Sequence, residues 1–246
     1  MQFPKANSFP KTLVQSKIMG PNPLKLCEEM LSIADECVGY RAIPERSVVL
    51  DLGSGTGITT AMLAREYSYT AYAADLWSNP TDNLRFFEQL SLTNQQAIPM
   101  KVDASEGMPF AEGFFDAAVS TDSYHYFGCD TEFLDAKLLP YVKRGGVIAA
   151  CFPGMKRDCH SNPPACLLAS WTPEQLDYIH DADWWHKVLQ RSKGAEILAI
   201  REMECTEEAW ADWLQCENEY AQGDRAAIEA GALDYLNSIT VVLRKK

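Results

Sequence analysis

The stretch VLDLGSGTG, residues 49–57, constrains the fold of this 246-residue chain more than any other feature. Its apolar, β-branched start is typical of a buried strand, and Gly53, Gly55 and Gly57 follow at once. Glycine permits positive φ angles and a close approach of the backbone to a ligand. The helical pattern that follows points its free N–H groups at the same loop. This order predicts a ligand site at the carboxyl end of the strand.

The rest of the chain continues the alternation of strands and helices. Strands are expected over 46–51, 70–74, 97–102, 115–120, 146–151, 196–201 and 238–243. Helices are expected over 24–38, 57–67, 83–90 and 130–141, at the capping sequence 172–175, across 181–186, and from 206 onward. Five alternations predict a parallel sheet with helices on both faces. Two late strands separated by a helical insertion predict a hairpin-like end to the sheet.

Composition narrows the classes of partner and compartment. The formal charge is −12, so a nucleic acid partner is not expected. No apolar run is long enough to cross a membrane, and the N-terminus lacks a signal-peptide pattern. Eight cysteines without a CxxC pair favour reduced thiols in the cytoplasm. Cys159, His160 and Cys166 lack a nearby fourth ligand, so no metal is expected.

The spacing of the glycines separates two classes of nucleoside-bearing cofactor. A dinucleotide loop reads G-x-G-x-x-G, and its third glycine would fall on Ile58. Asp51 also places a carboxylate beside the loop, which disfavours a pyrophosphate. S-adenosylmethionine carries a sulfonium and an ammonium and no phosphate, so a carboxylate attracts it.

Four segments together resemble the class I S-adenosylmethionine-dependent methyltransferases: VVLDLGSGTG, AYAADLW, KVDASEGMPF and FDAAVSTDSYHYF. The resemblance covers residues 46–152 and the late strand pair. It implies an α/β fold: a Rossmann-like, doubly wound seven-stranded sheet, mostly parallel with an antiparallel last strand, and helical lid insertions. We expect a single methyltransferase domain over 1–246, divided into an N-terminal helical segment (1–45), a cofactor-binding core (46–152), a lid (153–193), and the last strand pair with a helical insertion (194–246).

The same resemblance implies which residues hold the cofactor. Asp51 and the backbone of Gly53, Ser54 and Gly55 would hold its methionine part. Asp75 would bind the ribose hydroxyls, and Leu76 would pack on the adenine. The remaining expected contacts are Asp103 and Ala104 beside the adenine amino group, and Ser120 and Thr121 near the methionine carboxylate and sulfonium.

The acceptor side is less constrained by the sequence. His125 is either a general base or a histidine that only packs near the cofactor, and many methyl transfers need no base. The aromatic set that is expected to enclose the acceptor, or else to form a small core under the lid, comprises Tyr124, Tyr126, Trp171, Trp184, Trp185 and His186. The segment around 19–22 is expected to fold over the cofactor, and the chain is expected to be a monomer or a homodimer.

These observations predict a methyltransferase that moves a methyl group to O, N or S of a small molecule. Two alternatives stay open. One is an oxidoreductase that binds NAD(P) in the glycine loop. The other is a protein that binds S-adenosylmethionine without catalysis.

Overall fold

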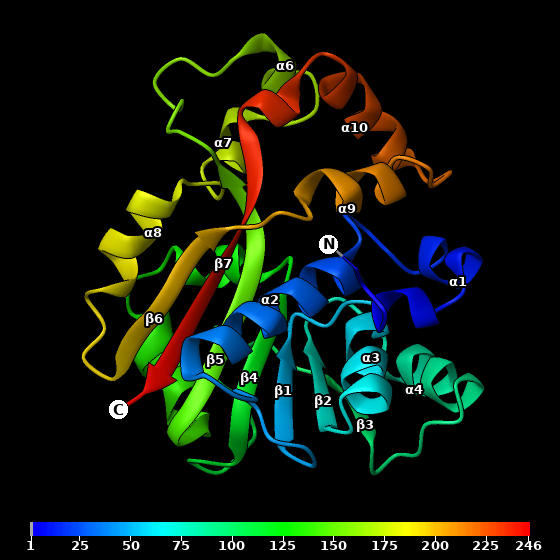
Figure 1. Ribbon diagram of the computed structural model, residues 1–246, viewed down its shortest axis with the longest axis vertical. Helices are drawn as coiled ribbons and strands as arrows, with labels where there is room; N and C mark the ends of the chain where they lie inside the picture. Colours follow the sequence, from blue (N-terminus) through cyan, green and yellow to red (C-terminus); the bar gives the residue numbers. More distant parts are fainter. Residues whose placement is uncertain (1) are drawn as a thin grey trace.

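A seven-stranded sheet forms the centre of the computed structural model, which describes residues 2–246 (Figure 1). Its strand order is β3-β2-β1-β4-β5-β7-β6. The strands are β1 (Val48–Leu52), β2 (Thr70–Asp75), β3 (Ala97–Lys101), β4 (Phe115–Thr121), β5 (Val142–Met155), β6 (Ala195–Glu202) and β7 (Leu236–Lys245). The first five are parallel, and β7 is antiparallel to both β5 and β6. The predicted mixed, doubly wound sheet with an antiparallel last strand is confirmed.

The helices connect and cover these strands. They are α1 (Lys11–Gln15), α2 (Pro23–Val38), α3 (Ile58–Glu66), α4 (Pro80–Gln89), α5 (Tyr124–Gly128), α6 (Ala165–Leu168), α7 (Pro173–Leu176), α8 (Ala182–Leu189), α9 (Thr206–Trp213) and α10 (Glu219–Glu229). Asn22 caps α2 by accepting from the Leu24 N–H, and Pro23 occupies the first turn. Thr172 and Gln175 form the predicted capping box at α7.

The predicted α-helix over 130–141 is wrong. The chain forms α5 directly after β4, and then a π-helical turn at Leu134–Leu138 and a 3-10 turn at Leu139–Tyr141. Pro140 supplies the reason for the last turn, because its nitrogen carries no hydrogen and cannot donate to a carbonyl four residues earlier. The two remaining 3-10 turns are Ala6–Ser8 and Ala232–Asp234.

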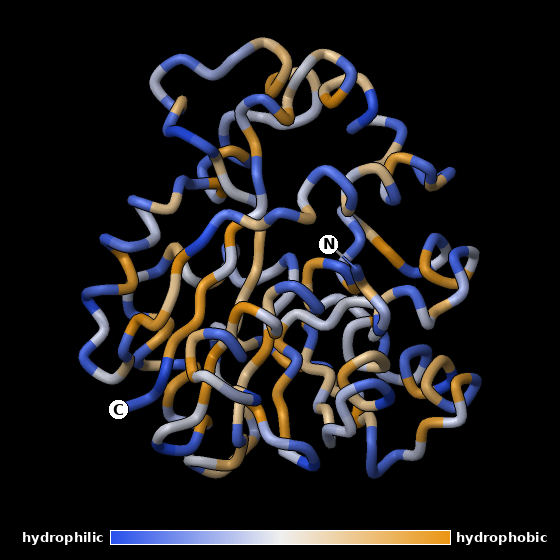
Figure 2. Tube along the Cα trace, viewed as in Figure 1, coloured by the Kyte–Doolittle hydropathy of each residue, from blue (hydrophilic) through white to orange (hydrophobic). Residues whose placement is uncertain are grey.

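Two apolar cores lie on opposite faces of the sheet, since side chains alternate along each strand. Val49 of β1 belongs to the core that also contains residues of α2, α3, α4 and α9, whereas its neighbour Leu50 belongs to the core that contains residues of α5, the π-helical turn and α8. Figure 2 shows the apolar strands inside a more polar periphery. The burial on both faces explains why these strands read as continuous apolar runs.

A third apolar cluster lies above the carboxyl end of β5, at the top of Figure 1. We call this part of the chain the cap: residues 165–179 together with 219–234. Its core includes Leu167, Leu176, Ile179 and Ala227. The cap thus joins two segments that are distant in sequence. Helix α8 lies within the predicted lid range, 153–193, but it packs on β6 and does not belong to the cap.

Candidate functional site

The glycine loop takes the conformation that its sequence predicts. The φ angles are +72° at Gly53, +51° at Gly55 and +82° at Gly57, a region that other residues enter only at a cost. The Gly53 N–H donates to the carbonyl of Ala74 at 2.8 Å, which holds the loop beside the end of β2. A Cβ atom on Gly53 would collide with the side chain of Ser123 after β4. The loop is therefore tightly enclosed by the ends of β2 and β4.

Asp75, the last residue of β2, connects the loop to the strand ends. Its Oδ2 accepts from the Gly55 N–H at 2.9 Å. Its Oδ1 accepts from the N–H groups of Trp77 at 2.9 Å and Ser78 at 2.6 Å. A carboxylate offers about four acceptor positions, so one remains open on Oδ2. That open position suits a hydroxyl donor such as one from a ribose.

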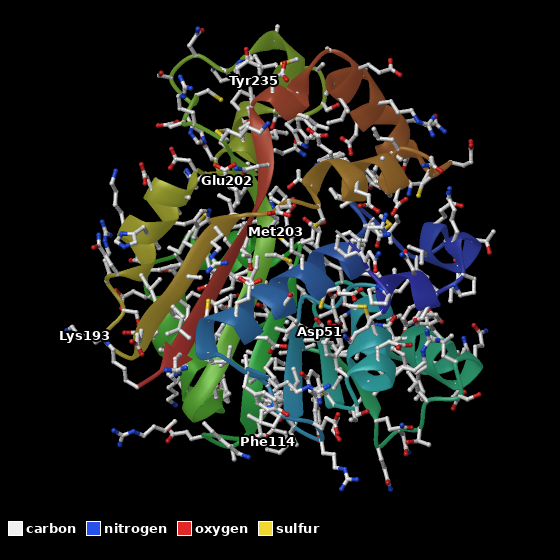
Figure 3. All side chains as sticks on the ribbon, viewed as in Figure 1. Asp51, Phe114, Lys193, Glu202, Met203 and Tyr235 are labelled. Carbon is white, nitrogen blue, oxygen red and sulfur yellow. The ribbon has the colours of Figure 1, made fainter. Side chains whose placement is uncertain are left out.

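Asp51 lies beneath the loop, where β1 meets α3 (Figure 3). Its side chain is fully buried, and its Oδ2 accepts from the hydroxyls of Thr59 at 2.8 Å and Thr60 at 2.6 Å. Its Oδ1 has no hydrogen-bond partner among residues 2–246. Burial raises the pKa of Asp51 to about 6; the Thr60 and Thr59 bonds oppose this rise, and the Asp75 charge adds to it. A buried carboxylate with an unused acceptor atom fits a site for a cationic ligand.

The end of β3 lies next to the end of β2, because the Val102 N–H donates to the carbonyl of Asp75 at 2.9 Å. Asp103 follows and accepts from the N–H and hydroxyl of Ser105 at 3.0 and 2.5 Å. These bonds lower the pKa of the exposed Asp103 carboxyl. Ala104 is buried, whereas Leu76 is 41% exposed. The structure thus brings the three predicted acids, Asp51, Asp75 and Asp103, to one edge of the sheet.

The end of β4 closes the other side of the loop. The hydroxyls of Ser120 and Ser123 both donate to the carbonyl of Leu52 at 2.8 Å. The buried Thr121 precedes Asp122, whose φ is +58°, an uncommon value for a residue with a side chain. The Asp122 N–H donates to the carbonyl of Cys151 at 2.7 Å. Such strained positions occur often at functional sites.

His125 lies on α5, immediately after this turn. Its side chain is 4% exposed, and its Nδ1 has no partner in the described chain. Burial lowers its pKa to about 3, so the imidazole is neutral at pH 7. Its ring lies 4.0 Å from that of Tyr126, which is 52% exposed. A neutral, desolvated imidazole is a poorer proton acceptor than an exposed one, which favours a packing role.

The N-terminal segment lies against the glycine loop and the end of β4. The Thr56 hydroxyl donates to the carbonyl of Lys17 at 2.7 Å. A Cβ atom on Gly20 would lie 2.5 Å from Oδ2 of Asp122, so this glycine allows close contact with the end of β4. The Asn22 N–H donates to the carbonyl of Ala209 at 3.0 Å, which ties the segment to α9.

The predicted acceptor aromatics do not lie together. Trp185 and Tyr124 are fully buried in the core with Phe152, at ring distances of 4.4 and 6.0 Å from it. Trp184 is half-buried and stacks on His180 at 3.6 Å. His186 is exposed on α8, and Trp171 packs edge-on against Trp210 at 6.1 Å. Tyr126 is therefore the predicted aromatic that lies exposed beside the strand ends.

Three residues near these strand ends were not among the predicted site residues. They are Trp77, Asp122 and Tyr178. The rings of Trp77 and Tyr178 lie 6.4 and 5.4 Å from the ring of Tyr126, and burial together with the Asp122 charge raises the pKa of Tyr126. Trp77 and Asp122 could have been predicted from the sequence, because each follows the carboxyl end of a parallel strand, β2 or β4. No local sequence pattern marked Tyr178, because its position depends on how the cap folds.

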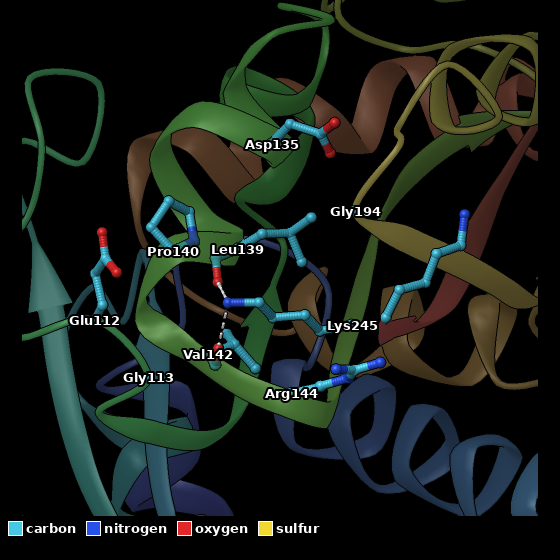
Figure 4. Close-up of a pocket in the computed structure, with 10 residues that line it drawn as sticks. Glu112, Gly113, Asp135, Leu139, Pro140, Val142, Arg144, Gly194 and Lys245 are labelled. Carbon is cyan, nitrogen blue, oxygen red and sulfur yellow. Dashed lines mark hydrogen bonds between the residues drawn. The ribbon is translucent and has the colours of Figure 1, made fainter.

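One hollow of the described chain lies at the opposite edge of the sheet (Figure 4). It measures about 550 Å³ and is lined by the start of β5 and the end of β7. Lys245 donates there to the carbonyls of Leu139 at 2.6 Å and Val142 at 2.8 Å. Ligands of parallel sheets bind at the carboxyl ends of the strands, so this hollow is not the cofactor site. Within residues 2–246, no three His, Cys, Asp or Glu side chains are grouped to hold a metal.

Comparisons with known proteins agree with this geometry. Residues 50–150 match the family model described as a methyltransferase domain. No curated protein was found to match the chain by sequence. Among the described residues, no helix is long and apolar enough to span a membrane.

Solved structures share the fold at low sequence identity. A phosphoethanolamine N-methyltransferase 2 from Haemonchus contortus, bound to S-adenosyl-L-methionine, has a TM-score of 0.71 and 16% identity; the match covers 93% of this chain and 54% of that one. A candidate sarcosine dimethylglycine methyltransferase from Galdieria sulphuraria has a TM-score of 0.68 and 16% identity, over 90% and 85% of the two chains. A geranyl diphosphate C-methyltransferase from Streptomyces coelicolor A3(2), bound to S-adenosyl-L-homocysteine, has a TM-score of 0.66 and 14% identity, over 87% and 79%.

Residues 50–150 thus match a methyltransferase domain in sequence, and the chain shares the fold of solved S-adenosylmethionine-dependent methyltransferases. The residues present fit S-adenosylmethionine as the cofactor: an open acceptor on Asp75, an unused buried oxygen on Asp51, and a loop whose three glycines take positive φ angles. The similar proteins differ in the acceptor atom, which is nitrogen for one and carbon for another. The fold therefore does not name the acceptor.

Proposed function

We propose that this chain transfers a methyl group from S-adenosylmethionine to O, N or S of a small molecule. The observation that carries the proposal is the hydrogen bond from the Gly55 N–H to the Asp75 carboxylate, which links the glycine loop to the end of β2. The cap and the N-terminal segment support a small acceptor, because both lie over the strand ends. A macromolecular substrate would need a more open edge.

The cofactor, when bound, supplies a methyl group made electrophilic by its sulfonium. Asp75 would accept from a ribose hydroxyl at the open position of Oδ2, and Asp103 would accept from the adenine amino group. Asp51 and the backbone of Gly53, Ser54 and Gly55 would hold the methionine part, beside Ser120 and Thr121. The chain itself orients donor and acceptor and excludes water, which suffices for much of the acceleration of a methyl transfer.

The test is methyl transfer from isotopically labelled S-adenosylmethionine into a whole-cell extract, which is then fractionated by size into small molecules, protein and nucleic acid. We expect the wild-type protein to label one small-molecule fraction, and Asp75→Ala to abolish that label. Asp183→Ala is the matched control, since it also removes one negative charge but lies exposed on α8. Label in protein or nucleic acid alone would contradict a small acceptor. Tight cofactor binding without label in any fraction would contradict catalysis.

A further inference from the structure

Three exposed aromatic side chains form a continuous line beside the strand ends. We call Trp77, Tyr126 and Tyr178 the aromatic row. They are 81%, 52% and 40% exposed, and neighbouring rings lie 6.4 and 5.4 Å apart. They come from the loop after β2, from α5, and from the loop after α7 in the cap. Large exposed aromatic surfaces gathered from distant segments typically mark a binding site.

The position of the row ties it to the proposed reaction. Trp77 lies two residues after Asp75 and donates its N–H to that carboxylate. Tyr126 lies on α5 directly beyond the end of β4, against the ring of His125. The row therefore runs from the expected ribose contact, past the end of β4, to the cap. An acceptor that reaches the methyl group would pass along it.

The charge next to the row is negative. Asp122 follows β4 directly, four residues before Tyr126 of α5, and its Oδ2 faces Gly20. Among the described residues, its side chain forms neither a hydrogen bond nor an ion pair. The titratable groups that face it are Asp224 of α10, Tyr126 of α5 and Cys151 of β5. Burial and the Asp224 charge raise the pKa of Asp122 to about 7.

Asp224 reinforces this negative charge. It accepts from the indole Nε1 of Trp213 at 2.8 Å, and burial raises its own pKa. A cation near both carboxylates would relieve their mutual repulsion. The electron-rich faces of the aromatic row also attract cations. The negative charge and the aromatic surface thus both favour a cationic ligand.

We propose that the aromatic row and Asp122 bind an aliphatic amine that arrives protonated, and that its nitrogen accepts the methyl group. This inference rests on the proposed function and names the acceptor class. The ammonium first gives a proton to the Asp122 carboxylate, which leaves a nitrogen lone pair. That lone pair forms the new N–CH₃ bond while the S–CH₃ bond breaks with its electron pair staying on sulfur. The positive charge moves from sulfur to the methylated nitrogen, and Asp122 then releases its proton to water.

The test compares two probes of one shape and different charge: choline, and its uncharged carbon isostere 3,3-dimethylbutan-1-ol. Their binding is measured by calorimetry on the protein saturated with S-adenosylhomocysteine. We expect choline to bind about tenfold more tightly than the alcohol, as cation–π contact and a nearby carboxylate imply. Tyr126→Leu and Asp122→Asn should each remove most of that preference. Asn tolerates the φ of +58° at this position, so the second variant should fold.

Two matched variants separate a binding role from a structural one. Tyr126→Phe keeps the ring and should keep the preference for choline. Tyr220→Leu changes another exposed tyrosine, 60% exposed on α10 and outside the row, and should change nothing. Equal binding of both probes, no binding of either, or an unchanged preference in Tyr126→Leu and Asp122→Asn would overturn the amine proposal. Binding of S-adenosylhomocysteine is recorded first, so failure of the cofactor site itself is seen separately.

Discussion

The most direct test of the site is Asp75→Ala. The side chain offers one open acceptor on Oδ2, and a hydrogen bond to a charged group contributes about 1.5–3 kcal/mol. Since about 1.4 kcal/mol corresponds to a tenfold change in affinity, the loss of this bond alone predicts a rise of about 10- to 150-fold in the Kd for S-adenosylhomocysteine. The variant also frees the Gly55 N–H from its 2.9 Å bond, so the loop loses an anchor as well.

Calorimetry and thermal unfolding measure these effects separately. Ligand at about 100 times its Kd stabilises a folded protein by about 2.7 kcal/mol, so the wild-type protein should gain several degrees in Tm with S-adenosylhomocysteine. Asp75→Ala should gain much less at the same ligand concentration, and Asp183→Ala should behave like the wild-type protein. A Kd for Asp75→Ala within about threefold of the wild-type value, well below the tenfold that one such bond implies, would refute the role given to this carboxylate if the variant still unfolds cooperatively.

Three further predictions concern stability. The pKa of His125 is about 3 in the folded protein and near 6.5 in the unfolded chain, so protonation favours the unfolded chain. The free energy of unfolding should therefore fall more steeply from about pH 6.5 to about pH 5 in the wild-type protein than in His125→Asn. If urea unfolding gives the same pH dependence for both proteins, this role of His125 is contradicted. Gly57→Ala should destabilise more than Gly55→Ala, because its Cβ would meet Phe87 at 2.8 Å whereas Gly55 faces open space; equal unfolding midpoints would contradict the contact. Lys25→Met should cost about 1–3 kcal/mol, since this buried ammonium pairs with two acids of α9 at 2.7 Å. A urea midpoint equal to that of the wild-type protein would show that the pairs contribute nothing.

Much of the sheet was predictable because its signals are local. The strand that ends at Leu52, the glycines after it and the helix from Ile58 all follow from neighbouring residues. Acids that end parallel strands must meet at one edge, so the strand pattern was enough to place Asp75 and Asp103 together. The segment around 130–141 was predicted wrongly, since Pro140 interrupts the backbone donors in a pattern that otherwise reads as helical.

The acceptor side depends on contacts between distant segments. The sequence alone could not separate Trp185, which the core buries completely, from Tyr126, which lies exposed beside the strand ends. It also could not show that Tyr178 of the cap lies against Tyr126, because β5 and the loops around it intervene.

By itself, the sequence determined the fold class and the edge of the sheet at which the glycine loop and the three acids lie, since periodicity and strand ends are properties of neighbouring residues. The tertiary structure alone decided that the cap joins residues 165–179 to 219–234 and that the Asp224 charge raises the pKa of Asp122. Burial and charge depend on every segment that packs around a side chain. They exist only once the chain has folded.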